Sequence, residues 1–338
     1  SLHDALPIFI LHIVDASGIE ALDTAGAWIL QTLLRRLRDG AAGVELHQLR
    51  PEFARLFDAL AQEAAPGPTF LPRPLSRLES LGQGTVTLLA QGCALLAFIG
   101  ECTFALGGWL AHPTRIRWRP ILYNIRSAGV DALPIVGLLS FLLGIVVAYQ
   151  GAAQLRLYGA NIFVVDLVAL SMLREFAPLI TAIIVAGRSG SAYAAQIGTM
   201  AVTEEIDAMR TIGIAPLDML VLPKALALLI TLPLLTLFAD LFGVLGGMLM
   251  AHIQLDVGTA EFLDRFVKTV SVTDLLIGIG KAPVFAAIIV TVGCFQGFQT
   301  KGGADSVGRQ TTRSVVHSIF MVIVADALFS VAFSALDL

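Results

Sequence analysis

Five apolar runs in the later part of the chain are each long enough to cross a lipid bilayer. A crossing helix needs about 20 mostly apolar residues, because the hydrocarbon core is about 30 Å thick. Hydrophobic residues make up 56% of the 338 residues and charged residues only 14%, against about 25% charged in an ordinary soluble domain. The sequence therefore predicts an α-helical integral membrane protein with five spans, Val130–Tyr149, Ile162–Gly187, Leu217–Ala251, Leu275–Phe298 and Val315–Phe333.

A sixth apolar run, Leu88–Ala111, carries one charge, Glu101, and many glycines and other small residues. It can either cross the bilayer or lie along the interface, and we expect an interfacial amphipathic helix ahead of the first span. A basic and aromatic segment follows it, which is typical of a cytoplasmic membrane surface. Its residues are Arg115, Arg117, Trp118, Arg119, Tyr123 and Arg126.

The first 63 residues have the alternating pattern of a small α/β unit rather than of a membrane helix. Two β-rich runs alternate with two segments of helical periodicity. The following stretch, AAPGPTFLPRP, contains four prolines and no periodicity, as a linker does. We therefore predict an α/β unit at 1–63, a linker at 64–80 and a membrane domain at 81–338. The α/β elements are Phe9–Val14, Ala27–Arg38, Val44–Leu46 and Pro51–Leu60.

The segment Asp15–Gly26, DASGIEALDTAG, resembles the STAS domain, which has an anti-sigma-antagonist-like fold. The resemblance lies in Asp-x-Ser-Gly after a strand and Asp-Thr-x-Gly at the start of a helix. It implies that Thr24 occupies the position that is phosphorylated in some members. Alternatively, Asp23 or Thr24 serves only as the N-cap of the helix. The family has further strands ahead of this one, so we predict a partial STAS-like domain.

A short charged stretch, Thr203–Gly213 (TEEIDAMRTIG), separates two of the predicted spans. Acidic residues at its start and a glycine at its end are typical of helix termini. We expect an amphipathic helix of one to three turns on the cytoplasmic side, with Thr203 as N-cap, that docks against another protein. Its polar residues are Thr203, Glu204, Glu205, Asp207 and Arg210, and its apolar side carries Ile206, Met209 and Ile212.

Small residues recur at every fourth position before this stretch and form one smooth side of a helix. Such a side lets a second helix approach closely, either within the chain or between two copies of it. The stripe consists of Ala182, Ala186, Gly190, Ala194 and Gly198.

Arg174 and Glu175 lie inside a predicted span, where charges are costly and are candidates for function. They could line the path of a substrate or form a gate. The alternative is a structural ion pair with a charge on another span, Lys224, Asp240 or Lys281.

The sequence contains no motif for catalysis, metal binding or nucleotide binding. The phosphate-binding pattern GxxxxGK[ST] is absent, and histidines and cysteines lack the spacing of metal ligands. The net charge of −4 and the dispersed basic residues give no indication of nucleic-acid binding. We therefore expect a non-enzymatic chain without a catalytic residue, metal or cofactor of its own.

The segment Leu173–Ala227 resembles the core of the MlaE family of ABC-transporter permeases, and Thr231–Leu235 and Thr311–Ser318 also match. The likeness covers roughly Leu81 to the end. It implies a permease homodimer that moves phospholipids or other hydrophobic molecules. The implied partners are a cytoplasmic ABC ATPase, which holds ATP and Mg, and an Mce-domain protein on the outer face. By the same resemblance, the stretch from Thr203 is the coupling helix that sits in the ATPase groove.

These expectations place the chain in the bacterial inner membrane, with a cytoplasmic N-terminus and, after five crossings, an external C-terminus. Lys301, Arg309 and Arg313 then fall on an inner loop, as the positive-inside rule requires. The alternative function is that of a membrane-anchored STAS signalling protein.

Overall fold

The computed structural model describes residues 11–19, 21–39, 43–63, 77–111 and 117–336. The chain forms two compact units, Ser1–Gln83 and Gly84–Leu338. Most of the predicted linker lies outside the described residues, since these resume only at residue 77.

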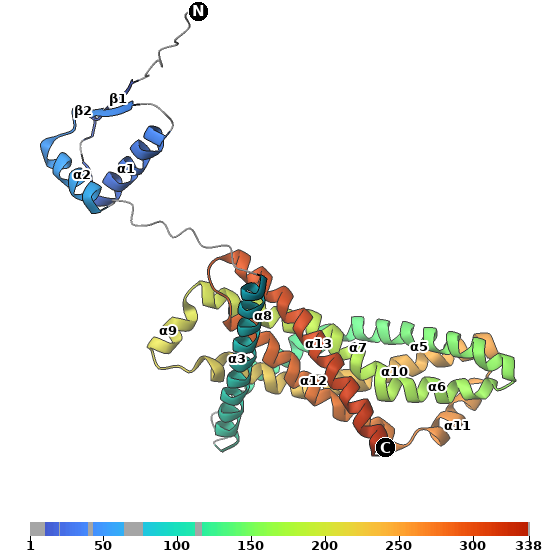
Figure 1. The fold of residues 1–338 in the computed structure, drawn as a ribbon. Coiled ribbons are helices and arrows are strands. Elements are labelled where there is room, and N and C mark those ends of the chain that lie inside the picture. Colours follow the sequence, from blue (N-terminus) through green and yellow to red (C-terminus); the bar gives the residue numbers. More distant parts are fainter. Residues whose placement is uncertain (1–10, 20, 40–42, 64–76, 112–116, 337–338) are drawn as a thin grey trace, which may run out of the picture. The chain divides into compact units, whose positions relative to one another are not determined.

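The N-terminal unit contains two parallel strands and two helices (Figure 1). Strand β1 pairs with β2 in a register that runs from Leu11 opposite Gly43 to Asp15 opposite His47. The parallel pairing follows from the intervening helix, because parallel strands need a crossover connection. The predicted order of strand and helix is confirmed, with bounds β1 Leu11–Asp15, α1 Thr24–Asp39, β2 Gly43–His47 and α2 Pro51–Glu63.

Asp23 is the residue that caps α1. Its Oδ1 accepts a hydrogen bond of 2.7 Å from the backbone N–H of Gly26, which satisfies one of the free donors at the helix start. Thr24 is the first helical residue, and its side chain is exposed.

The described residues of the membrane unit form helices and short connections, with no strand. Its α-helices are α3 Arg77–Ala111, α4 Trp118–Ala128, α5 Leu133–Leu155, α6 Val164–Ser171, α7 Ala177–Val185, α8 Ser191–Val202, α9 Glu205–Thr211, α10 Leu222–Leu255, α11 Thr259–Thr269, α12 Val272–Phe298 and α13 Ala304–Ala335. Short 3-10 turns join some of them: η2 Val130–Ala132, η3 Arg156–Tyr158 and η4 Asn161–Phe163. Three π-helical turns interrupt the others: η5 Met172–Phe176, η6 Ala186–Gly190 and η7 Leu217–Val221.

Six helices in the described residues, rather than five, are long and apolar enough to cross a membrane. Each of the five predicted spans lies within one of them. The sixth is Leu81–Trp109 in α3, the run for which the sequence left crossing and interfacial placement open.

Helix α3 contacts the rest of the membrane unit at one end of the bundle. The Phe98 ring lies 5.7 Å from that of Phe295 and 5.8 Å from that of Phe298, both in the last turn of α12. Trp109 clusters with Leu222, the first residue of α10. Figure 1 shows α3 running across the direction of α5 and α10. This arrangement favours the interfacial alternative for α3.

Glycines bring α5 and α10 into close contact along their length. A Cβ atom added to Gly144 would overlap the carbonyl of Gly243, and one added to Gly246 would overlap the carbonyl of Phe141. Only backbones without side chains can approach so closely. Gly137 meets Phe238 one to two turns earlier, so the two helices run in the same direction. The bundle consequently has α9 at one end and α11 at the other (Figure 1).

Candidate functional site

The short helix α9 is set off from α8 by a sharp turn of the backbone. Glu204 adopts a left-handed conformation with φ of 60° and occupies the N-cap position without a side-chain cap. The prediction that Thr203 caps this helix is wrong. Thr203 ends α8 instead, and its hydroxyl lies 3.1 Å from the carbonyl of Thr199 and 3.1 Å from Oε1 of Glu205. The turn makes α9 a separate element with its own direction.

Two residues of the side that was predicted to dock on a partner, Ile206 and Met209, instead face the chain itself, whereas the third, Ile212, is exposed. Ile206 is only 4% exposed and belongs to the main hydrophobic core, and Met209 is half-buried. The buried side of α9 thus packs on the end of the helical bundle of the same chain. The surface that α9 and its C-cap residue present outward contains the apolar Ala208 and Ile212, the latter 72% exposed. Its exposed polar residues are Glu204, Glu205, Asp207 and Arg210.

A charge network lies inside the bundle, around a lysine that is fully buried. Lys281 of α12 donates hydrogen bonds to Glu175 Oε2 at 2.8 Å and to Asp326 Oδ1 at 3.1 Å. Glu175 also accepts from the hydroxyl of Ser330 at 3.1 Å. One ammonium group therefore joins η5, α12 and α13.

The local sequence explains why a main-chain carbonyl joins this network. Lys281 Nζ also donates to the carbonyl of Arg174 at 3.0 Å. In a regular α-helix that carbonyl would accept from the N–H of residue 178, but Pro178 has none. The π-helical turn η5 lies at the same place, and such turns are frequent at functional sites.

Arg174 extends the network toward the start of α12. Its guanidinium donates to Asp274 Oδ1 at 3.1 Å. Asp274 is fixed in turn by a capping box with Ser271, whose hydroxyl donates to it at 2.7 Å. Arg174 and Glu175, neighbours in sequence, thus bind different partners on the same helix.

Of the alternatives for an ion pair, the structure selects Lys281. Lys224 lies over the ring of Tyr193 at 5.5 Å, and both carboxylate oxygens of Asp240 are buried without a hydrogen-bond partner among the described residues. Glu175 is nevertheless 39% exposed at its side chain, whereas Lys281 is 0% exposed. Glu175 is therefore the carboxylate through which this network reaches the protein surface.

The small-residue stripe is buried within the chain, so its contact is not one between two copies. A Cβ on Gly190 would lie 3.2 Å from Ile289 of α12, and one on Gly198 would lie 2.8 Å from the Thr300 hydroxyl oxygen. From the other helix, a Cβ on Gly297 of α12 would lie 2.7 Å from the Cβ of Ile197 in α8. The stripe, Ala182, Ala186, Gly190, Ala194 and Gly198, is the face of α7, η6 and α8 that packs on α12 and its following turn.

At the opposite end of the bundle from α9, helix α11 is held by one aspartate. Asp166 of α6 accepts from Nε of Arg265 at 2.8 Å, from a second guanidinium nitrogen, and from the Thr269 hydroxyl at 2.7 Å. Arg265 also lies over the ring of Phe163 at 5.0 Å. These contacts fix α11 against η4 and the start of α6. These contacts could not be predicted from the sequence, because the partners are about a hundred residues apart.

Residues 121–332 match the family model described as permease MlaE, which is more than half of the chain. The chain belongs to the MlaE permease family. The matched range contains α9, the stripe and the charge network, so all three are parts of the permease proper. The N-terminal unit with Thr24 lies outside it.

Relatives of the permease occur in bacteria and in plants. A probable ABC transporter permease protein of Rickettsia prowazekii is 35% identical over 213 residues, covering 63% of this chain and 82% of the relative. One from Synechocystis is 34% identical over 216 residues, 64% of this chain and 82% of the relative. The chloroplastic protein trigalactosyldiacylglycerol 1 of Arabidopsis thaliana is 34% identical over 216 residues, 64% of this chain and 62% of the relative. The permease is thus a membrane component of an ABC transporter.

Proposed function

We propose that the permease moves phospholipids or related hydrophobic molecules across or out of the bacterial inner membrane, driven by a separate cytoplasmic ATPase. The observation that carries the proposal is α9, a seven-residue helix with an exposed outer surface between two long apolar helices. A permease without an ATP-binding motif needs a surface on which a partner ATPase can bind and transmit its conformational change. ATP and Mg accordingly belong to the ATPase.

A lipid-like cargo is supported by a relative and by the position of Glu175. The Arabidopsis relative carries the name of a galactolipid. In this chain, Glu175 combines partial exposure with a buried network behind it, which suits a group that meets the polar end of a lipid. Arg174 and Glu175 thus line the proposed path or its gate.

The parallel course of α5 and α10 supports an orientation for the permease. If α9 is cytoplasmic, α5, α10 and α13 run outward, and α6–α8 and α12 run inward. With α3 at the interface, the N-terminus is cytoplasmic and the C-terminus external. A second copy and an Mce-domain protein complete the proposed complex, with the Mce-domain protein at the α11 end.

Reconstitution of the permease with its ABC ATPase in proteoliposomes tests this function. The assay follows ATP-dependent transfer of a fluorescent phospholipid to an acceptor protein or vesicle. Glu175→Gln should lower transfer at least tenfold while the complex still assembles, and Glu261→Gln on α11 is the matched control. If Glu175→Gln lowered lipid transfer and complex assembly equally, Glu175 would have a structural role and no role in the lipid path.

The same preparation distinguishes the transporter from the alternative, a membrane-anchored STAS signalling protein. A membrane-anchored STAS protein would show phosphorylation of Thr24 and no ATPase association. ATPase co-purification with ATP-dependent lipid transfer, unaffected by Thr24→Ala, supports the transporter.

A further inference from the structure

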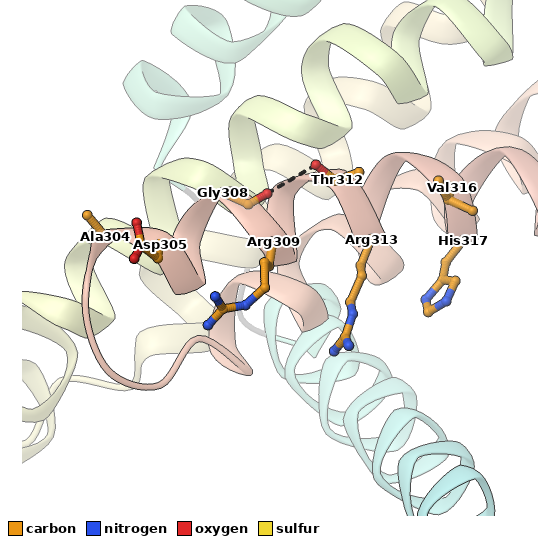
Figure 2. A pocket seen from close by; sticks show the side chains of 8 residues that line it. All are labelled: Ala304, Asp305, Gly308, Arg309, Thr312, Arg313, Val316 and His317. Carbon is orange, nitrogen blue, oxygen red and sulfur yellow. Dashed lines mark hydrogen bonds between the residues drawn. The ribbon is translucent and has the colours of Figure 1, made fainter. Parts of the chain in front are cut away.

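The start of α13 carries a groove with two arginines on its rim (Figure 2). Its volume is about 620 Å³. Gly308, Thr312 and Val316 line it together with Arg309 and Arg313, which the sequence analysis placed on a loop. Helix α13 instead begins at Ala304, and this puts both arginines on regular helix.

Three side chains that can donate hydrogen bonds leave the same side of α13 in Figure 2. Arg309, Arg313 and His317 are spaced four residues apart, which aligns them along one side of a helix. All three are exposed. Together they form a line of donors along the groove.

The hydrogen bond that His317 forms within the chain identifies which of its ring nitrogens can donate to a ligand. Its Nδ1 lies 3.0 Å from the Gln296 amide nitrogen. An amide nitrogen only donates, so Nδ1 accepts and the ring proton resides on Nε2. The ring therefore presents its Nε2–H group to a ligand.

The positive charge of Arg309 and Arg313 is not neutralised by ion pairs with other described residues. Among the described residues, neither Arg309 nor Arg313 forms an ion pair, and no side chain or carbonyl accepts a hydrogen bond from them. Asp305 also lines the groove, which leaves a net charge of one positive unit. The Thr312 hydroxyl is engaged by the Gly308 carbonyl at 3.1 Å, so the arginines and His317 are the free donors.

The two arginines lie next to the apolar part of α13. The apolar run of α13 starts at Val315, two residues after Arg313, and basic residues just outside such a run sit among the headgroups. Val316, one residue into the run, gives the groove an apolar wall on its membrane side. The planar guanidinium group matches a phosphate with two parallel hydrogen bonds.

We propose that this groove binds the phosphate of an anionic phospholipid of the cytoplasmic leaflet. Arg309 and Arg313 hold the phosphate, His317 donates from Nε2, and an acyl chain follows Val316 into the bilayer. The choice of leaflet rests on the proposed orientation, but the binding does not depend on lipid being the cargo. The site lies at the opposite end of α13 from Asp326 and is separate from the charge network.

Native mass spectrometry of the full chain in neutral detergent tests the site without ATPase or transport. Phosphatidylglycerol and phosphatidylcholine are titrated separately. We expect phosphatidylglycerol to bind more tightly, and the double variant Arg309→Gln, Arg313→Gln to weaken its binding by about tenfold or more. Arg313→Lys, which keeps the charge but loses the planar pair of donors, should weaken binding less than the double variant does.

Lys301→Gln is the matched control, because Lys301 is an exposed basic residue at the same end that does not line the groove. It should change phosphatidylglycerol binding by less than about twofold. Unchanged binding in the double variant would overturn the proposal, as would an equal loss in the control. Displacement of the lipid by millimolar inorganic phosphate would assign the groove to free phosphate. A change in oligomeric state without a change in lipid binding would assign it to contacts between copies.

Discussion

Lys281 shows how single residues hold this bundle together. It is the only fully buried charge among the described residues, and its ammonium group has two carboxylates and a carbonyl as acceptors. A buried charge of this kind is tolerated only when its partners are in place. Removing the lysine is therefore a larger perturbation than removing one of its carboxylates.

Lys281→Met should destabilise the permease more than Glu175→Gln. The first change leaves Glu175 and Asp326 without their shared cation, and breaking such a buried pair typically costs about 3–5 kcal/mol. The second leaves Asp326 to neutralise Lys281. Thermal unfolding of the purified variants in detergent measures the difference. Lys268→Met, at an exposed residue of α11, is the control and should not shift the midpoint. A Lys281→Met protein as stable as the wild type would contradict this description of the network.

The sequence could indicate these residues but not fully pair them. A charge inside an apolar run is conspicuous, so Arg174 and Glu175 were found. Their partners depend on how distant helices pack, and a single sequence contains no signal for that. Lys281 was one of three alternatives, and the pair of Arg174 with Asp274 was missed.

At the scale of elements, small residues decide which helices touch. Gly190 and Gly187 lie in the same π-helical turn, yet a side chain on Gly190 would meet Ile289, whereas nothing lies within 4 Å of a Cβ on Gly187. The two glycines therefore have the same local backbone conformation and differ only in whether another helix packs against them.

Gly190→Leu should therefore lower stability where Gly187→Leu does not. Overpacking a tight contact typically costs about 1–3 kcal/mol. Thermal midpoints and the monodisperse fraction after detergent extraction provide the comparison. Similar behaviour of the two variants would mean that α12 does not lie against this face.

Helix α9 illustrates the limit of periodicity as a guide to function. The 3.6-residue pattern indicated an apolar side and a polar side, and the element exists where expected. Periodicity does not identify the surface that covers the apolar side, so Ile206 was assigned to a partner when it packs on its own chain. The long spans were predictable because run length alone identifies them. The π-helical turns were not, since no local residue pattern specifies them.

Ile206→Asp should consequently damage the permease itself. A buried unpaired carboxylate is strongly unfavourable, so we expect aggregation or a low yield of extracted protein. Met209→Asp, at a half-buried position, should have a smaller effect. Size-exclusion profiles of both variants show which is correct, and a monodisperse Ile206→Asp protein would place that side chain at the surface after all.

At the scale of the whole molecule, the chain consists of two units with different kinds of core. The α/β unit has its own paired strands and capped helix, while the membrane unit has the matched family range. We expect Leu75–Leu338 to insert into the membrane and to be extracted as a monodisperse species. The measurement is membrane fractionation followed by size-exclusion chromatography. Loss of insertion would show that the membrane unit requires the N-terminal unit.

In the proposed function, α9 is the place where an ATPase acts on the permease. Ala208 of α9 and Ile212, its C-cap residue, are the apolar residues presented outward here. A charge introduced into a dry contact is left unpaired. Val267 of α11 is a matched control, because it is an apolar residue of similar exposure at the other end of the bundle.

The most direct test is co-purification of the ABC ATPase with the permease carrying Ile212→Asp or Val267→Asp, each first shown to be monodisperse. We predict that Ile212→Asp reduces the recovered ATPase at least tenfold, whereas Val267→Asp retains it. Full ATPase recovery with Ile212→Asp and Ala208→Asp, or equal loss with Val267→Asp, would contradict the assignment of α9 as the coupling helix.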